Sequence, residues 1–443
     1  MTTDGSTPEG IARDAEIRAL TKAHVFQSWS AQADLNPTPL AGGEGAWFWD
    51  HVGNKWLDFS SQLVNVNLGY RHPDMTAALK AAAEGLAMVS PAMAHESRAR
   101  AAEAIAGLAP EGMNKIFFTN GGQDAIENAV KLARGHTGRH KVLSAYRSYH
   151  GAGTLSQTLT GEPRRWAAES GVSGVVHFWG PHLYRSEFDS STPEEESQRS
   201  LRNIRRTIEV EGPDGIAAIV MESVVGTNGV LVPPPGFWPG LRALCDEFGI
   251  MLIADEVMAG FGRCGSWFAF ERFDVAPDLI AFAKGVNSGY VPLGGVVMTD
   301  AIADTYAHKP FPGGLTYSGH PLACATAVAA IDIMRRDGVV EHAREVGESV
   351  LGPALAELAQ RHACIGQVRG IGLMWAVEFV SDAQAKTPLD AATMGTLIHA
   401  CRAEGIWPFM AGNRLHLVPP LVITADEVRQ GVAALERALG RLP

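Results

Sequence analysis

Met251-Leu252-Ile253-Ala254-Asp255-Glu256-Val257 is the stretch of sequence that decides the fold. It begins with apolar residues that predict a buried strand, and the strand ends in two consecutive carboxylates. Open α/β sheets bind their ligands beyond the carboxyl ends of the parallel strands. A buried charge also requires a compensating partner. We therefore expect a ligand site at the end of this strand, with Asp255 in it.

A second stretch repeats this design with the opposite charge. Leu279 to Ala283 predicts another buried strand, and Lys284 follows it directly. A lysine amine can form a Schiff base with an aldehyde, and a carboxylate can keep a pyridine nitrogen protonated. The two residues therefore fit a single cofactor that carries both groups. A structural ion pair inside the sheet is the alternative that spacing alone leaves open.

A glycine-rich turn offers a candidate phosphate site. Thr119-Asn120-Gly121-Gly122-Gln123-Asp124 follows a predicted strand and opens an amphipathic helix. The free N–H groups of such a turn and the positive end of the helix favour an anion. An ordinary strand-to-helix turn is the alternative. After the next strand, Tyr149 offers a flat aromatic face for a planar ring, although a lone tyrosine more often lies in the core.

The middle of the chain alternates strand-like and helix-like patterns, which predicts an α/β domain with a largely parallel sheet. The expected strands are Lys115 to Thr119, Lys141 to Ala145, Ile216 to Glu222, Ile250 to Asp255, Leu279 to Lys284 and Gly294 to Thr299. The expected helices include Asp124 to Arg134, closed by Gly135, Trp238 to Phe248, closed by Gly249, and Pro321 to Arg336.

The two ends of the chain predict a second, smaller domain. Ala46 to Phe59 has the pattern of a β-hairpin, and a strand pair is expected around Ile371 to Phe379 and Arg414 to Val418. We expect residues 1–69 to contribute to the small domain, residues 70–330 to form the large domain and residues 331–443 to complete the small one.

Composition narrows the class of protein. The 443 residues carry a formal charge of -11, so a phosphate backbone is not an expected partner. The five cysteines are scattered, which favours a reducing cytoplasm. Neither an export signal nor an apolar run of the roughly 18 residues that span a bilayer is present, so we expect no membrane partner. The histidines lack the spacing of a metal site, so no metal is expected.

Several segments together resemble the class III, or omega, aminotransferases over nearly the whole chain. They are Tyr149-His150-Gly151, Asp255-Glu256-Val257-Met258-Ala259-Gly260-Phe261-Gly262-Arg263, Ala283-Lys284-Gly285 and Thr316-Tyr317-Ser318-Gly319-His320-Pro321. The resemblance implies an α/β protein with the fold type I of pyridoxal-phosphate (PLP) dependent transferases. That fold has a large domain with a mostly parallel central sheet and a smaller α+β domain.

The resemblance also implies roles for single residues. Lys284 is then the Schiff-base lysine and proton carrier, and Asp255 contacts the pyridine nitrogen of PLP. Val257 and Tyr149 are then expected on the two faces of the ring. Gly122 and Gln123 are expected to bind the phosphate, together with Thr316 from the other subunit of a homodimer. Glu222 is expected in the loop that lines the site. A loop cap is the alternative for Glu222. The sequence departs from the family at Gln123, where many relatives have serine or alanine, and at Ile126, where asparagine is usual.

The expected reaction moves an amino group from an amine or ω-amino acid to a keto acid such as pyruvate by a ping-pong mechanism. Within the family, the sequence as a whole most resembles the ω-amino acid:pyruvate and taurine:pyruvate branch. Tyr149, Leu63 and Val64 match positions that shape the substrate pocket. Phe409 stands where many relatives have a mobile arginine, and Arg414 is the candidate replacement that binds a carboxylate or sulfonate. A solvent-exposed strand arginine is the alternative.

Other functions are compatible with some of the same residues. An aminomutase, a decarboxylase of the same fold and a PLP-binding protein without turnover share most of the expected site. Gly260-Phe261-Gly262-Arg263-Cys264-Gly265 also matches the dinucleotide-binding pattern Gly-x-Gly-x-x-Gly. A dinucleotide fold requires a helix that opens on the third glycine, whereas an aromatic-rich loop is expected there. A dinucleotide-dependent oxidoreductase therefore remains the remote alternative.

Overall fold

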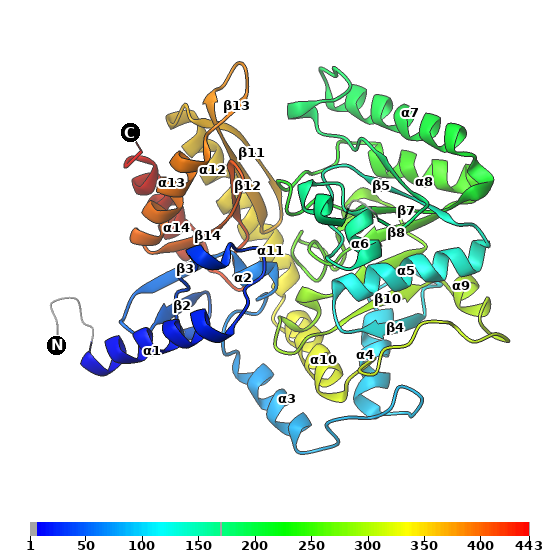
Figure 1. Cartoon of the computed structure of the whole chain (residues 1–443), viewed down its shortest axis with the longest axis horizontal. Helices are drawn as coiled ribbons and strands as arrows, with labels where there is room; N and C mark the ends of the chain where they lie inside the picture. The colour runs from blue at the N-terminus through cyan, green and yellow to red at the C-terminus, as the bar shows by residue number, and fades with distance from the viewer. Residues whose placement is uncertain (1–6, 169–170, 443) are drawn as a thin grey trace.

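The computed structural model describes residues 7–168 and 171–442, which form two β-sheets and the helices around them (Figure 1). The first sheet has seven strands in the order β4-β10-β9-β8-β7-β5-β6. Strands β5 to β9 run parallel, and β10 is antiparallel to both of its neighbours. The strands are β4 (Lys115–Thr119), β5 (Lys141–Ala145), β6 (Val175–Phe178), β7 (Ile216–Glu222), β8 (Met251–Asp255), β9 (Leu279–Phe282) and β10 (Gly294–Met298).

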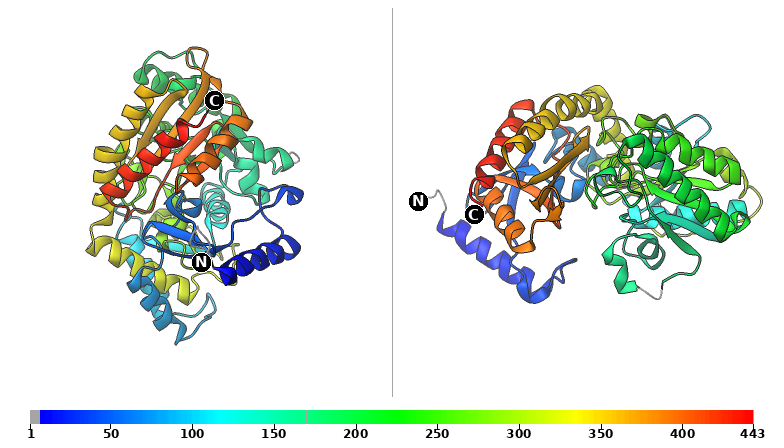
Figure 2. Two further views of the ribbon diagram at one scale, coloured as in Figure 1. Left: turned by 90° about the vertical axis from the view of Figure 1, so that its left-hand side faces the viewer. Right: turned by 90° about the horizontal axis from the view of Figure 1, so that it is seen from above.

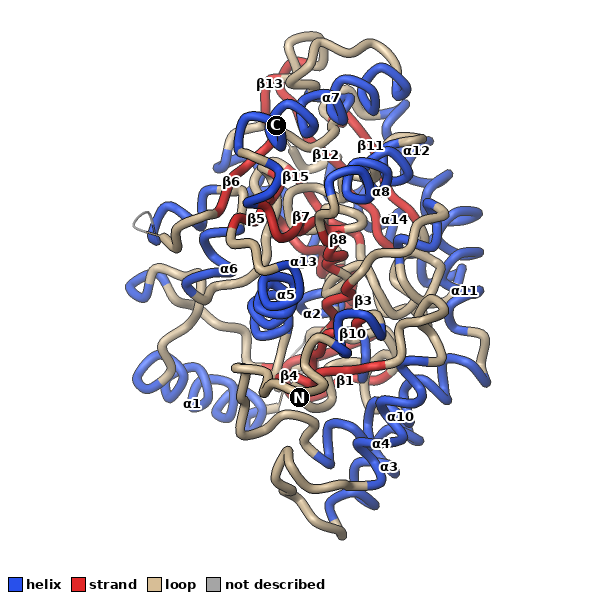
Figure 3. The backbone as a smooth tube through the Cα atoms, turned by 90° about the vertical axis from the view of Figure 1, so that its right-hand side faces the viewer, coloured by secondary structure: helices blue, strands red, loops and turns tan. Residues whose placement is uncertain are grey.

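This sheet is buried on both faces, which explains its continuous apolar strands. Side chains alternate between the faces of a strand. In β7, Ala218 and Val220 pack with the apolar face of α5 (Gly122–Thr137). Ile219 and Met221 pack on the other side with α7 (Pro193–Glu211) and α8 (Phe237–Phe248). Figure 3 shows the strands as a red band between these helices.

The second sheet joins the two ends of the chain. Its order is β1-β2-β3-β14-β15-β12-β11, with β13 paired to β12. Figure 2 shows the blue N-terminal strands beside the orange and red C-terminal elements. Strand β3 pairs in parallel with β14. The strands are β1 (Leu40–Glu44), β2 (Trp47–Asp50), β3 (Lys55–Phe59), β11 (Ile365–Ile371), β12 (Met374–Asp382), β13 (Thr387–Pro388), β14 (Ile406–Ala411) and β15 (Arg414–Leu417).

The remaining helices cover these sheets or connect them. They are α1 (Pro8–His24), α2 (Ser61–Val64), α3 (Pro73–Ala83), α4 (Glu96–Ala106), α6 (Thr154–Leu159), α9 (Asp300–Asp304), α10 (Pro321–Arg336), α11 (Val339–Val346), α12 (Gly352–Arg361), α13 (Ala391–Ala403) and α14 (Ala425–Leu439). No helix within the described ranges is long and apolar enough to cross a membrane.

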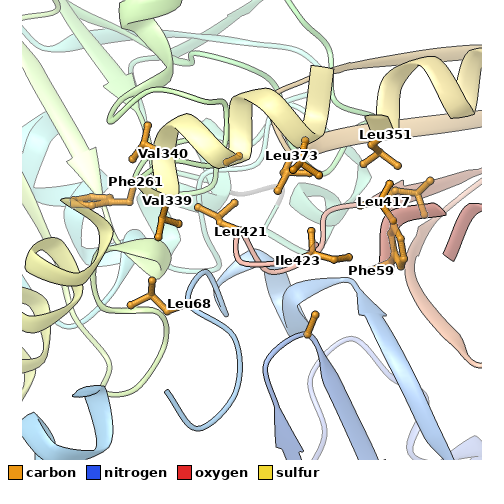
Figure 4. Close-up of a cluster of buried hydrophobic side chains, with 14 of the residues drawn as sticks. Phe59, Leu68, Phe261, Val339, Val340, Leu351, Leu373, Leu417, Leu421 and Ile423 are labelled. Atoms are coloured by element: carbon orange, nitrogen blue, oxygen red, sulfur yellow. The ribbon is translucent and has the colours of Figure 1, made fainter. Parts of the chain in front are cut away.

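One large apolar core joins the two sheets. It includes Phe59 of β3, Val339 of α11 and Leu417 of β15, together with Phe261 from the loop after β8 (Figure 4). Leu421 and Ile423, from the segment that follows β15, lie in the same cluster. Because residues from both ends of the chain pack against the loop that follows Asp255, the small sheet and the candidate site share one core.

A buried arginine ties the same segments together. Arg263 is fully buried and donates hydrogen bonds from Nη1 to the carbonyls of Leu373 (3.0 Å) and Pro419 (2.5 Å). Its Nη2 donates to Ser61 Oγ (3.2 Å) and Asn67 Oδ1 (3.1 Å). Burial lowers the pKa of Arg263 to about 10, which still leaves the guanidinium charged at neutral pH. A single side chain thus joins the loop after β8 to both ends of the chain.

The segment that Arg263 holds has an unusual backbone. Ser61, Gln62 and Val64 have φ angles of 46°, 59° and 60°, in the left-handed region that costs energy for residues other than glycine. Ser61 Oγ also donates to Val418 O (2.6 Å). These hydrogen bonds offset the strain and hold the segment that contains Leu63 and Val64.

Most expected elements are confirmed within one or two residues, including the hairpin of β2 and β3 and the pairing of β12 with β15. The expected end of the helix at Gly135 is wrong, because α5 continues to Thr137 and ends at Gly138 with φ 69°. Gly135 is instead a point of close approach, since a Cβ there would overlap the hydroxyl of Tyr306. The strands that were not expected are β1, β6, β11, β13 and β14.

The dinucleotide interpretation of Gly260 to Gly265 has no support in the fold. The segment is a turn, and the next helical element is a 3-10 helix at Ala269–Phe273. Gly262 and Gly265 have φ angles of 88° and 75°, so they serve the turn that carries Arg263 into the core.

We expect Arg263→Met to lower the free energy of unfolding by about 3 to 5 kcal/mol, because four buried acceptors lose their donor. Urea unfolding of both proteins measures this difference. Arg429→Met, which removes an exposed arginine of α14, is the matched control and should change stability by less than about 0.5 kcal/mol. A loss below about 1 kcal/mol for Arg263→Met would contradict the role given to this residue.

Candidate active site

The carboxyl ends of the first sheet open into a cavity of about 470 Å³. Seven of the expected cofactor contacts line it: Gly122, Gln123, Tyr149, Glu222, Asp255, Val257 and Lys284. They come from the ends of β5, β7, β8 and β9 and from the start of α5. The amine and the carboxylate that the sequence singled out thus face the same space, as the cofactor hypothesis requires.

Asp255 is held at this edge by two hydrogen bonds. Its Oδ1 accepts the Val257 N–H (3.0 Å), and its Oδ2 lies 2.7 Å from Nδ1 of His150. An ionised carboxylate only accepts hydrogen bonds, so His150 carries its proton on Nδ1. Both side chains are buried, at 4% and 0% exposure. His150 therefore orients Asp255 and keeps its charge compensated.

Lys284 lies at the end of β9 in a strained conformation. Its φ angle is 45°, which is rare for a side chain of this size and typical of functional sites. Burial lowers the pKa of its amine, although Asp255 and Glu222 oppose this shift. A lowered pKa increases the neutral fraction of the amine at neutral pH, and only the neutral form is nucleophilic.

The start of α5 provides a cradle for an anion. The helix begins at Gly122 after Gly121, and no side chain caps its first N–H groups. A Cβ at Gly122 would lie 2.6 Å from Cγ1 of Val257, so only glycine allows this close approach. The uncapped N–H groups and the helix dipole favour a phosphate here. The neighbouring Ile126 packs in the core under the helix, where a polar side chain would need a hydrogen-bond partner.

Glu222 both lines the cavity and caps a loop. Its Oε1 accepts the Tyr149 N–H (2.9 Å), and its Oε2 accepts the Gly226 N–H (2.7 Å). Glu222 is also the direct neighbour of Asp255 across β7 and β8. Burial raises its pKa, and the charge of Asp255 acts in the same direction. Glu222 can therefore be both a residue of the cofactor site and a loop cap.

A second cavity of about 610 Å³ adjoins the first and shares Lys284, Tyr149, Trp29, Thr227 and Met258 with it. Leu63, Val64 and Arg414 line this second cavity, together with Phe409. Arg414 is therefore not a solvent-exposed strand arginine. Its guanidinium and the amine of Lys284 lie around one space.

Thr316 does not lie with the other expected contacts. It is exposed, in a loop before α10, and is absent from the residues that line the two cavities. A contact between Thr316 and the phosphate cradle of the same chain is therefore not seen.

Several lining residues were not expected from the sequence. His150 was quoted only as part of a motif, although its place beside Tyr149 at a strand end was a usable signal. Trp29 and Arg164 also line the second cavity, and the Arg164 guanidinium lies 3.8 Å from the centre of the Tyr149 ring and pairs with Glu162. No sequence pattern pointed to these long-range contacts. Within residues 7–168 and 171–442, no cluster of three or more potential metal ligands is found.

A strand-end lysine and carboxylate, an aromatic face and a helix N-terminus around one cavity define the site of a PLP-dependent enzyme. Comparison with known proteins identifies the family. Residues 30–439 match the aminotransferase class-III family, and the chain belongs to it. It is a PLP-dependent aminotransferase of fold type I, as the sequence indicated.

Individual relatives cover almost the whole chain. The putrescine–pyruvate aminotransferase of Pseudomonas aeruginosa is 31% identical over 97% of this chain and 96% of the relative. The taurine–pyruvate aminotransferase of Rhodobacter capsulatus is 32% identical over 97% of each chain. The structure of the taurine:2-oxoglutarate aminotransferase from Bifidobacterium kashiwanohense, in complex with PLP and glutamate, superposes with a TM-score of 0.93 at 39% identity and covers 96% of this chain and 97% of that one.

Next to Asp255, Glu256 is a fully buried carboxylate with a strongly perturbed pKa. It accepts the N–H groups of Ala269 (2.8 Å) and Phe270 (3.2 Å) and the hydroxyl of Ser223. Burial nevertheless raises the pKa of Glu256 from 4.5 to about 7. Between these two pH values the folded state retains a proton that the unfolded state releases, so stability falls as the pH rises.

We expect Glu256→Gln to remove this loss of stability. The free energy of unfolding of the variant, relative to the parent protein, should improve by up to about 3 kcal/mol between pH 4.5 and pH 7.5. Urea unfolding at both pH values measures the change, with Glu103→Gln on the exposed face of α4 as the control. A difference between variant and parent that does not depend on pH would contradict the shifted pKa.

Proposed function

We propose that this aminotransferase takes as its amine donor an ω-amino acid that ends in a carboxylate or sulfonate, and passes the amino group to a keto acid such as pyruvate. The observation that carries the proposal is that Arg414 and Lys284 line one cavity. A donor can then present its amine to Lys284 and its anionic end to the guanidinium, whose planar fork suits two-point binding of an anion. The two relatives that carry taurine in their names support an anionic end.

The arrangement of residues supports the following roles. PLP, when bound, supplies an aldehyde that reacts with amines and a ring that withdraws electrons from the carbon bearing the amine. The N–H groups at the start of α5, at Gly122 and Gln123, hold the phosphate. Asp255, oriented by His150, accepts a hydrogen bond from the protonated ring nitrogen. Tyr149 and Val257, which line the cavity, would pack against the ring, and Glu222 keeps the loop of Tyr149 in place.

Lys284 would hold PLP through its amine, which can form a Schiff base with the aldehyde. As a free amine, the same side chain would take a proton from the donor carbon and give it back, which requires a base that is neutral near pH 7. Burial lowers the pKa of Lys284 and so favours this neutral form. Leu63 and Val64, in the strained segment, shape the wall beside the donor.

We also propose a homodimer in which Thr316 completes the phosphate site of the partner. Thr316 is exposed in its own chain, and its neighbour Tyr317 is 57% exposed. Arg98 joins this loop to a second one by hydrogen bonds to Gly319 O (2.9 Å) and Met93 O (2.7 Å), and Met93 is 65% exposed. Adjacent exposed apolar side chains on two loops favour a partner surface.

The division of the chain and its location belong to the same proposal. Strands from residues 1–69 and 331–443 share one sheet, and strands from 70–330 form the other, which supports these ranges as parts of a small and a large domain. The cysteines are all free, and four of the five are buried, which favours a reducing compartment such as the cytoplasm.

Lys284→Ala tests the anchoring residue. After borohydride reduction, mass spectrometry of the parent enzyme should find the cofactor on the peptide that contains Lys284, and the variant should carry none. Gel filtration should also strip the cofactor from the variant. The matched control is Lys80→Ala, which removes an exposed lysine of α3. Cofactor found covalently bound in the Lys284→Ala protein would remove the assignment.

Arg414→Met tests the proposed donor class with two amines of equal length. The KM for 4-aminobutyrate should rise about 30-fold, which corresponds to the loss of about 2 kcal/mol from a charge-assisted contact, while the KM for butylamine changes less than threefold. With donor alone, the parent should release one carbonyl product per site, and pyruvate should restore turnover; an aminomutase or decarboxylase would not behave in this way. Equal losses for the two donors would contradict the anionic donor class.

A further inference from the structure

Arg414 does not form an ion pair with Glu378, the carboxylate that its position in the sheet would favour. Glu378 on β12 lies directly opposite Arg414 on β15 in the antiparallel pair. Opposite charges at such positions attract each other across a sheet. Among the described residues, however, Arg414 has no hydrogen-bond or ion-pair partner, and its buried Nε is unpaired. The guanidinium borders the second cavity instead.

Glu378 forms ion pairs with two other arginines instead. Arg185 Nε donates to Oε1 of Glu378 at 2.7 Å, and Arg369 Nη2 contacts Oε2 at 2.8 Å. Although burial raises the pKa of Glu378 most strongly, the charges of Arg369 and Arg185 more than offset this effect and lower it. Glu378 is therefore an ionised carboxylate shared by two cations, and only 1% of its side chain is exposed.

Arg369 is fixed in place and lies beside Arg414. Its Nε donates to Gly229 O (2.6 Å), and its Nη1 donates to Gln367 Oε1 (2.6 Å). A Cβ at Gly229 would clash with Arg369 Nη2 and lie 2.9 Å from Arg414 Cδ, so both arginines pack on this glycine. Removing Arg369 would leave Oε2 of Glu378 without a cation and with Arg414 as its neighbour.

The histidines near Glu378 add no positive charge to this region. Burial and the neighbouring arginines lower the pKa of His416, on the same strand as Arg414, to about 3. His182 is likewise kept neutral, since burial and the neighbouring arginines lower its pKa to about 2. Arg147 has its own carboxylate in Glu187. Three guanidinium groups, those of Arg185, Arg369 and Arg414, therefore lie around Glu378, and its carboxylate pairs with the first two.

We propose that Arg369 determines donor specificity by keeping Glu378 away from Arg414, so that Arg414 stays free to bind the anionic end of the donor. Arg369 is a positioning residue, because it acts through Glu378 and does not border either cavity. This inference rests on the proposed donor class. It adds that selectivity for anionic donors depends on a residue outside the site.

The experiment compares Arg369→Gln, Glu378→Gln and the double variant in the PLP-loaded enzyme. Glutamine keeps a donor for Gly229 O but removes the charge that holds Glu378. The measurements are KM and kcat for 4-aminobutyrate and butylamine, and the Kd of butyrate, which carries the carboxylate without the amine, by calorimetry. Arg429→Gln on α14 is the surface control.

In Arg369→Gln, Glu378 is expected to pair with Arg414. The KM for 4-aminobutyrate and the Kd of butyrate should then rise about tenfold, while KM and kcat for butylamine stay within threefold of the parent values. Adding Glu378→Gln should restore the KM and the Kd to within threefold of the parent values. A purely structural role for Arg369 would instead impair both donors alike, and the second substitution would not rescue it.

Equal losses for the two donors, or no rescue in the double variant, would overturn the inference. Glu378→Gln alone should leave binding of butyrate as tight as in the parent or tighter, and weaker binding would also overturn it. If Arg369→Gln does not fold, Arg369→Met and the single Glu378→Gln variant carry the same test. If Arg414→Met does not selectively weaken binding of 4-aminobutyrate, the proposed donor class is wrong. If Arg414→Met has this selective effect but Arg369→Gln does not, only the inference about Arg369 is wrong.

Discussion

The carboxylate of Asp255 is buried at the end of a parallel strand, and such a charge must be compensated by its surroundings. The structure meets this requirement on one side with His150 and the Val257 N–H, and leaves the other side to the cavity that Lys284 enters. A protonated ring nitrogen is the partner that this geometry favours. The rest of the site follows from the same sheet edge, because the start of α5 and the ends of β5, β7 and β9 lie beside β8.

Charge balance shapes the donor side as well. On the cofactor side each charged group faces a partner or the cofactor, whereas Arg414 is left without one because Glu378 is already shared by Arg185 and Arg369. An unpaired cation in a partly desolvated cavity binds an anion more strongly than one that already has a counter-ion. In our proposal, the choice of donor therefore depends on which of several neighbouring arginines pairs with Glu378.

The two sides of the site belong to different sheets, and their relative position depends on the core between them. Arg263 and the apolar cluster around Phe261 and Leu421 connect the loop that follows Asp255 to both ends of the chain. They also hold the strained segment at Ser61 to Val64, which forms a wall of the second cavity. The energy of strain near the donor is therefore offset by buried hydrogen bonds away from it.

The sequence by itself determined the sheet, its strand ends and the placement of Lys284 and Asp255 at one edge, because apolar strands that end in charged residues are local patterns and parallel strands bring their carboxyl ends to one edge. It did not determine the contact of His150 with Asp255 or the reason for Gly135, which depend on neighbours far along the chain. Only the tertiary structure decided that Arg414 borders the cavity while Glu378, its neighbour across the sheet, binds other arginines. The physical reason is that a charged side chain chooses its partner by distance in space, and the order of residues along the chain does not record that distance.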